Sequence, residues 1–132
     1  MSDSFGLDTS VIVRLLSGEP PELAESALRW LQEQAAADRE CFVSDLVVAE
    51  AYFALHHHYD VPKEEAVASL ISFLKSPGIV ARGEALKTLE QTAGATSKPG
   101  FVDRLIQAQY NPARLVSCEK AASRLPNCVL LR

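Results

Sequence analysis

Short apolar runs alternate with longer segments of helical periodicity along the whole chain, and this alternation limits the possible folds more than any other feature. The expected strands are residues 5–7, 41–43, 79–81, 114–117 and 128–131. The expected helices are residues 10–17, 21–38, 45–58, 62–75, 83–92, 101–110 and 120–125. Strands that alternate with helices form parallel sheets covered on both faces. The sequence therefore predicts an α/β fold in which helices cover both faces of a parallel sheet.

The length of the chain sets the number of domains. Its 132 residues can bury a sizeable core, but they are too few for a catalytic domain plus a separate substrate domain. We therefore expect a single domain over residues 1–132. No stretch approaches the roughly 20 apolar residues of a membrane span, and residues 1–4 do not resemble a targeting segment. A cytoplasmic protein without a membrane partner is expected.

The net charge and the cysteine content argue against several classes of protein and of site. A formal net charge of -4 argues against a generic nucleic-acid-binding domain, although it is compatible with a nuclease whose carboxylates bind cations. Cys41, Cys118 and Cys128 are odd in number and lack paired short spacings, so they predict neither a zinc knuckle nor a disulfide framework.

Asp8 stands where the first expected strand passes into the first helix. Ligands of open α/β sheets bind beyond the carboxyl ends of the strands, which is where this carboxylate lies. Aspartate is also a favoured N-cap residue, so Asp8 can simply cap the helix. The local sequence leaves both roles open.

Three later acids have similar surroundings. Glu50 lies on a mostly apolar helix, Asp103 lies near the start of its helix, and Glu119 follows the strand at 114–117. A structural salt bridge would explain Glu50, and the helix dipole would explain Asp103. However, strands one and four can be neighbours at the switch point of a doubly wound sheet, which would place Asp8 and Glu119 on one rim. Glu50 and Asp103 can then reach the same crevice.

Four clustered carboxylates cannot all stay ionised without a cation. A site made of oxygen ligands selects Mg²⁺ or Mn²⁺, and such a site can activate water to attack a phosphodiester. The hydroxyls of Thr9 and Ser117 are placed to orient the carboxylates. Residues 56–58 are three consecutive histidines, which point about 100° apart on a helix and so do not predict a single metal site.

Four motifs, in order along the chain, carry a resemblance to a known family. They are Leu7-Asp8-Thr9-Ser10 with residues 13–16, then residues 43–50, Phe101-Val102-Asp103-Arg104 with residues 105–106, and Ser117-Cys118-Glu119 with residues 120–122. The chain resembles PIN domains and, more narrowly, the VapC-type toxins of bacterial toxin-antitoxin pairs. The resemblance implies a PIN-like three-layer α/β sandwich around a central four- or five-stranded parallel sheet. It also implies a Mg²⁺- or Mn²⁺-dependent endoribonuclease that cleaves RNA, forms a homodimer and is inhibited by a cognate antitoxin. Asp8, Glu50, Asp103 and Glu119 would be its metal-binding and catalytic residues.

The chain departs from the family pattern at two positions. The last motif usually reads Thr, any residue, Asp, whereas Glu119 is one methylene longer than aspartate. Gly100 stands where the family often has a second aspartate, three residues before the main one. These departures keep a second function open, in which the protein is a catalytically weakened PIN fold that serves as a dimerisation or partner-binding module.

Two further expectations concern function and assembly. A phosphotransfer domain with Asp8 as phosphoacceptor is a third interpretation, but Asp8-Thr9-Ser10 lacks the second aspartate of the corresponding phosphatases. The helix at residues 63–75 carries an apolar stripe that is a candidate for pairing across a two-fold axis. The stripe consists of Val67, Leu70, Ile71 and Leu74.

Overall fold

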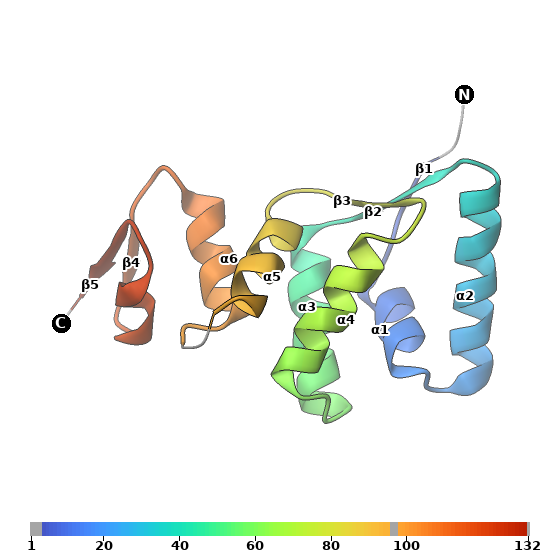
Figure 1. Cartoon of the computed structure of the whole chain (residues 1–132), viewed down its shortest axis with the longest axis horizontal. Coiled ribbons are helices and arrows are strands. Elements are labelled where there is room, and N and C mark those ends of the chain that lie inside the picture. The colour runs from blue at the N-terminus through green and yellow to red at the C-terminus, as the bar shows by residue number, and fades with distance from the viewer. Residues whose placement is uncertain (1–3, 96–97, 132) are drawn as a thin grey trace.

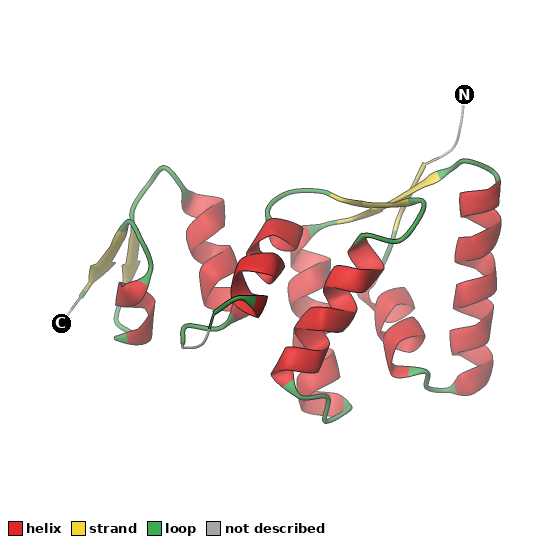
Figure 2. Ribbon diagram, viewed as in Figure 1, coloured by secondary structure: helices red, strands yellow, loops and turns green. Residues whose placement is uncertain are grey.

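The computed structural model describes residues 4–95 and 98–131 (Figure 1). The ends of the predicted domain, at residues 1–3 and 132, and residues 96–97 lie outside the described part. The elements run β1 (Ser4–Gly6), α1 (Thr9–Ser17), α2 (Pro21–Ala36), β2 (Glu40–Val43), α3 (Asp45–His58), α4 (Lys63–Leu74), β3 (Ile79–Ala81), α5 (Ala85–Ala93), α6 (Phe101–Tyr110), β4 (Leu115–Ser117), the 3-10 helix η1 (Ala121–Arg124) and β5 (Cys128–Leu130). The predicted alternation of strands and helices is confirmed (Figure 2).

Local sequence signals explain where several helices begin and end. Pro21 begins α2, as its fixed φ favours at a first helical position. Ser44 caps α3 by accepting a hydrogen bond from the Val47 amide at 3.3 Å. Gly18 ends α1 in the left-handed region, with φ of 72°, and its amide donates to the Arg14 carbonyl at 2.9 Å.

All paired strands are parallel, as predicted, but they are divided between two sheets. One sheet has the order β1-β2-β3, and β4 pairs only with β5. The five strands of the predicted single sheet are therefore divided into two groups, which lie at opposite ends of the molecule (Figure 1). The reason is the position of α6, which buries Phe101 and Leu105 in the main core and leaves the following strand beyond it.

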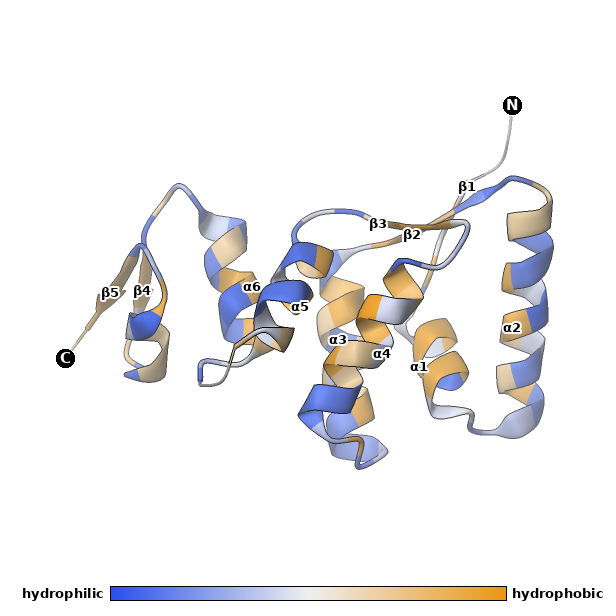
Figure 3. Ribbon diagram, in the orientation of Figure 1, coloured by the Kyte–Doolittle hydropathy of each residue, from blue (hydrophilic) through white to orange (hydrophobic). Residues whose placement is uncertain are grey.

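One face of the main sheet packs against the core. Phe5, Cys41, Val43 and Ile79 point to the core, which lies between this face and the helices below it (Figure 1). On the other face Phe42 is covered by Arg82, whose guanidinium carbon lies 3.7 Å from the ring centre. The apolar residues concentrate on α1, α3 and α4, the helices that form the core (Figure 3).

The apolar stripe of α4 faces this core. Val67, Leu70 and Leu74 are buried within the chain itself, and Ile71 is half-buried against the same cluster. The stripe was predicted as a candidate dimer interface, and that prediction is wrong because the chain's own sheet and helices already cover it.

Within residues 4–95 and 98–131, no helix is long and apolar enough to cross a bilayer.

Candidate functional site

Asp8 caps α1 and remains exposed to solvent. Its Oδ2 accepts a hydrogen bond from the Ser10 hydroxyl at 2.8 Å and a longer one from the Ser10 amide at 3.4 Å. The hydroxyl bond, helped by the amide, lowers the pKa of the Asp8 carboxyl below its ordinary value, so the group is charged at neutral pH. Both hydrogen bonds from Ser10 reach Oδ2, and Asp8 thus caps α1, one of the two roles that the sequence left open.

Thr9 joins Asp8 to Glu50. The Thr9 hydroxyl donates a hydrogen bond of 3.0 Å to Oε1 of Glu50, 41 residues further along the chain. This contact brings the start of α1 beside the middle of α3, so that Asp8 and Glu50 flank one threonine. We call Asp8 and Glu50 the acidic pair. In the described part of the chain, neither carboxylate forms an ion pair, so their negative charge is not neutralised by a basic side chain.

Glu50 is exposed, whereas the apolar surroundings in sequence predicted a mostly buried environment. The difference arises because α3 is apolar on both sides. Leu46 and Phe53 lie on the same side of the helix as Glu50, and their exposed fractions are 72% and 45%. The helix thus presents an apolar surface to solvent with one carboxylate in its middle.

A pocket of about 360 Å³ lies beside the acidic pair, and we call it the α3 pocket. It is lined by Thr9, Glu50, Phe53, Ala54, His57 and His58. The Phe53 and His57 rings are stacked, with centres 5.8 Å apart and planes 22° from parallel. Two adjacent aromatic faces beside a carboxylate can hold a flat heterocycle.

The rings of His56 and His57 touch edge to face, with centres 4.9 Å apart, but each has a further contact of its own. His56 contacts the Val61 carbonyl through Nδ1 at 2.9 Å, while His57 lies against Phe53. Across the described segments, no group of three or more His, Cys, Asp or Glu side chains is close enough to hold one metal ion.

Asp103 and Glu119 are both exposed and lie outside the acidic pair. Asp103 is in the first turn of α6, and Glu119 follows β4 in the smaller sheet. Ser117 accepts a hydrogen bond of 3.0 Å from the Glu119 amide, so its hydroxyl fixes the backbone of this turn rather than a carboxylate. The expected proximity of Asp8 and Glu119 required β4 beside β1, and in this structure those strands belong to different sheets.

The acidic pair fits a divalent cation as part of a ligand set. Its donors are carboxylate and hydroxyl oxygens, which suit a hard cation such as Mg²⁺ or Mn²⁺. Asp8 accepts hydrogen bonds from Ser10, Glu50 accepts one from Thr9, and hydrogen bonds of this kind orient metal-binding carboxylates. Two carboxylates supply only part of such a site, so further ligands must come from other residues or water.

Asp45 is a functional side chain that the sequence reasoning missed. Its two oxygens accept hydrogen bonds of 2.9 Å from the amides of Glu84 and Ala85, and Oδ2 also accepts one from Gln109 at 3.0 Å. Asp45 therefore caps α5 from the start of α3 and connects both to α6. Gly83 was the available signal, because a glycine just before a helix often marks a close approach.

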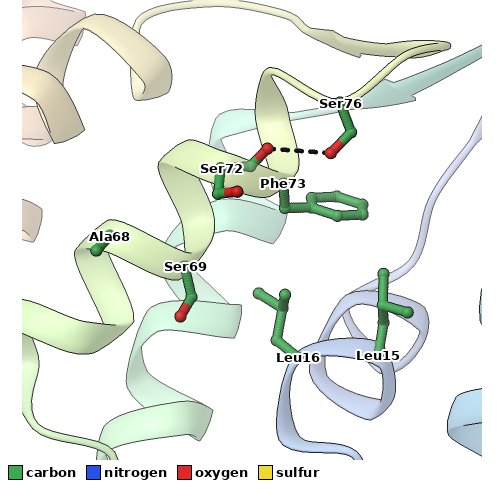
Figure 4. Close-up of a pocket in the computed structure, with 7 residues that line it drawn as sticks. All are labelled: Leu15, Leu16, Ala68, Ser69, Ser72, Phe73 and Ser76. Carbon is green, nitrogen blue, oxygen red and sulfur yellow. Dashed lines mark hydrogen bonds between the residues drawn. The ribbon is translucent and has the colours of Figure 1, made fainter.

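A second pocket lies at the opposite end of α1 from Asp8. It measures about 460 Å³ and is lined by Leu15, Leu16, Ala68, Ser69, Ser72, Phe73 and Ser76 (Figure 4). The Ser76 hydroxyl donates to the Ser72 carbonyl at 3.0 Å, so it is already satisfied. The lining has no charged side chain, and the pocket is therefore no candidate for metal-dependent chemistry.

Comparisons with known proteins give a family match and a likeness to solved structures. A family model described as PIN domain matches residues 6–125, a range that includes Asp8, Glu50, Asp103 and Glu119. The chain is similar in structure to VapBC2 from Rickettsia felis bound to a DNA fragment from their promoter, with 23% sequence identity, 98% of each chain covered and a TM-score of 0.45. No curated protein matches the chain significantly.

Proposed function

The chain belongs to the PIN domain family, and we propose that it is a VapC-type endoribonuclease, the toxin of a type II toxin-antitoxin pair. The family assignment confirms the resemblance inferred from the four motifs. PIN domains are in general nucleases that use divalent metal ions. The observation that carries the proposal is the acidic pair, in which Glu50 accepts a hydrogen bond from Thr9, the residue next to Asp8. We further propose that residues 1–132 act as one domain in the cytoplasm.

Asp8 and Glu50 would hold Mg²⁺ or Mn²⁺, with Asp103 and Glu119 as further proposed ligands. When bound, the cation supplies an activated water and neutralises charge on the phosphate of the RNA. Ser10 and Thr9 donate hydrogen bonds to Asp8 and Glu50, and these bonds would help to orient the two carboxylates toward a cation.

Metal binding is expected to stabilise the protein. Millimolar Mn²⁺ should raise the melting temperature by about 3 to 10 °C, because a cation that binds only the folded state adds about 1 to 3 kcal/mol. Differential scanning calorimetry with Mn²⁺, Mg²⁺ and EDTA measures the shift. The variant Glu50→Gln should show a smaller shift, and an equal shift in the variant would argue against the acidic pair.

The α3 pocket provides a place for a nucleobase next to the acidic pair. Stacking of a base on an aromatic side chain contributes about 1 to 3 kcal/mol. Phe53→Ala is therefore expected to weaken RNA binding about 5- to 100-fold. Fluorescence anisotropy with a labelled RNA, in Ca²⁺ to limit cleavage, gives the dissociation constant. Leu46→Ala is the matched control, since it removes an exposed apolar side chain from the same helix without removing a ring. Equal effects of both substitutions would argue against base stacking.

A cognate antitoxin is the proposed protein partner. An arginine of the antitoxin would bind the carboxylates of the acidic pair, because a guanidinium pairs with carboxylates in a bidentate manner. The exposed Leu46 and Phe53 beside Glu50 suit the apolar face of a partner helix.

A second candidate function is the catalytically weakened module for dimerisation or partner binding. It is favoured by the separation of Glu119 from the acidic pair. A protein of this kind would bind its partner but would neither cleave RNA nor gain stability from Mn²⁺.

A further inference from the structure

The strand β1 has one edge that is open to a further strand. It pairs with β2 on one side, and in residues 4–95 and 98–131 no strand pairs with its other side. Such an edge presents unpaired amide and carbonyl groups to solvent and readily accepts another strand. The sheet thus ends at the strand that leads directly to Asp8.

Residues 115–130, which comprise β4, η1 and β5, form a small sheet that lacks a covering layer. We call them the C-terminal unit. No residue of the unit belongs to the main core, and its buried residues Ala122 and Leu125 form part of the unit itself. Val116 has an exposed fraction of 58%, although parallel strands are ordinarily buried on both faces. Two strands are also too few for an independently stable sheet.

The unit is held at the end of the molecule far from β1. Phe101 and Leu105 anchor α6 in the core of its own chain. The amide of Gln107 donates to the Pro126 carbonyl at 3.1 Å, and Asn127 donates to the Pro112 carbonyl at 3.0 Å, so the unit is fastened to the end of α6. Residues 111–114 connect it to α6 and span at most about 14 Å. With α3, α4 and α5 in between, the unit faces away from its own β1 (Figure 1).

We propose that the C-terminal unit of one chain adds to the open β1 edge of a second copy, and that the two copies exchange these units reciprocally. Each chain carries one open β1 edge and one C-terminal unit. A two-fold exchange pairs every open edge with the unit of the other chain, so the assembly is closed at two copies. The resulting sheet has five parallel strands in the order β3-β2-β1-β4-β5, the last two from the partner. The interface thus uses β1 instead of the buried stripe of α4.

This exchange would complete the acidic site, an inference that rests on the proposed nuclease function. Asp8 lies two residues after Gly6, the last residue of β1, and Glu119 lies two residues after Ser117, the last residue of β4. Neighbouring parallel strands lie about 4.8 Å apart, so pairing Gly6 with Ser117 brings both carboxylates to the same rim. Glu119 would then serve the acidic pair of the other chain.

A disulfide cross-link tests the exchange without any reference to activity. Gly6→Cys and Ser117→Cys are introduced together, with Cys118 and Cys128 replaced by serine; a side chain at Gly6 meets no atom within 4 Å. Neighbouring strands have the separation that a disulfide needs, so oxidation should give a covalent dimer. The control pair, Val80→Cys with Ser117→Cys, places the first cysteine on β3 and should stay monomeric. An intrachain disulfide, or no disulfide, would overturn the proposal.

Complementation between two inactive chains tests the shared site. Asp8→Asn and Glu119→Gln chains, co-expressed with different tags, should form heterodimers with one fully native site and about half the wild-type cleavage rate. The matched pair Asp8→Asn with Glu50→Gln should recover no cleavage activity. Asp8 and Glu50 of each site come from the same chain, so each site of this heterodimer lacks one of the two carboxylates. Active wild type without recovery in the first pair would overturn the exchange. If the wild type does not cleave RNA but the cross-linked dimer forms, the nuclease function is refuted and the exchange of C-terminal units is still supported.

Discussion

Replacing Asp8 by asparagine is expected to reduce RNA cleavage by at least about 100-fold and to leave the fold intact. The change removes the negative charge that a cation requires, and loss of even an outer-shell partner of a metal site costs about 10- to 100-fold. Asparagine caps helices as well as aspartate does, so α1 should keep its N-cap. Cleavage rates of a fluorogenic RNA, together with circular dichroism spectra, measure both parts of the expectation.

Asp38→Asn is the matched control for this substitution. Asp38 is also exposed, but it lies just before the start of β2, whereas Asp8 lies just after the end of β1. The two residues are therefore at opposite ends of the parallel strands. Its φ of 61° is one that asparagine adopts readily. The control should retain full activity. If Asp8→Asn cleaves RNA as fast as the control, Asp8 is only a helix cap.

Replacing Gly83 by alanine is expected to lower the free energy of unfolding by about 3 kcal/mol. Gly83 has a φ of 99°, and an added Cβ would lie 2.5 Å from Oδ2 of Asp45. Alanine therefore strains the backbone and displaces the carboxylate that caps α5, which loses two charge-assisted hydrogen bonds. The melting temperature should fall by about 10 °C, and urea titration gives the free energy directly.

A double-mutant cycle separates the two causes of this loss. In the Asp45→Ala background the added Cβ of Gly83→Ala no longer meets a carboxylate, so the second substitution should cost less than in the wild type. Gly100→Ala is the control, because no atom lies within 4 Å of its added Cβ and its φ of -80° is ordinary. A loss at Gly83 no larger than at Gly100 would contradict the role assigned to Asp45.

The sequence was sufficient to predict the features that depend on local signals. Short apolar runs and helical periodicity indicated each strand and helix within a few residues, since Pro21, Ser44 and Gly18 mark helix ends by their own conformational preferences. Asp8 and Thr9 lie just beyond the end of β1, which is why the sequence indicated a candidate site there, and the role of that site stays a prediction.

The features that depend on packing could not be predicted from sequence. Whether β4 lies beside β1 depends on where α6 is anchored, and the burial of Phe101 and Leu105 decides that only in the folded chain. The exposure of Glu50 was missed because α3 is apolar on both sides. The Asp45 cap joins residues 39 and 40 positions apart, a distance at which no local pattern is informative.

Cleavage of RNA by the purified wild-type protein, with Mn²⁺ and with EDTA, tests the central claim most directly. We predict that a mixed RNA substrate is cut in millimolar Mn²⁺ or Mg²⁺, that EDTA stops the reaction, and that excess Mn²⁺ restores it. Cleavage that continues in EDTA, or RNA that remains intact with every cation, would contradict the account of this protein as a metal-dependent ribonuclease.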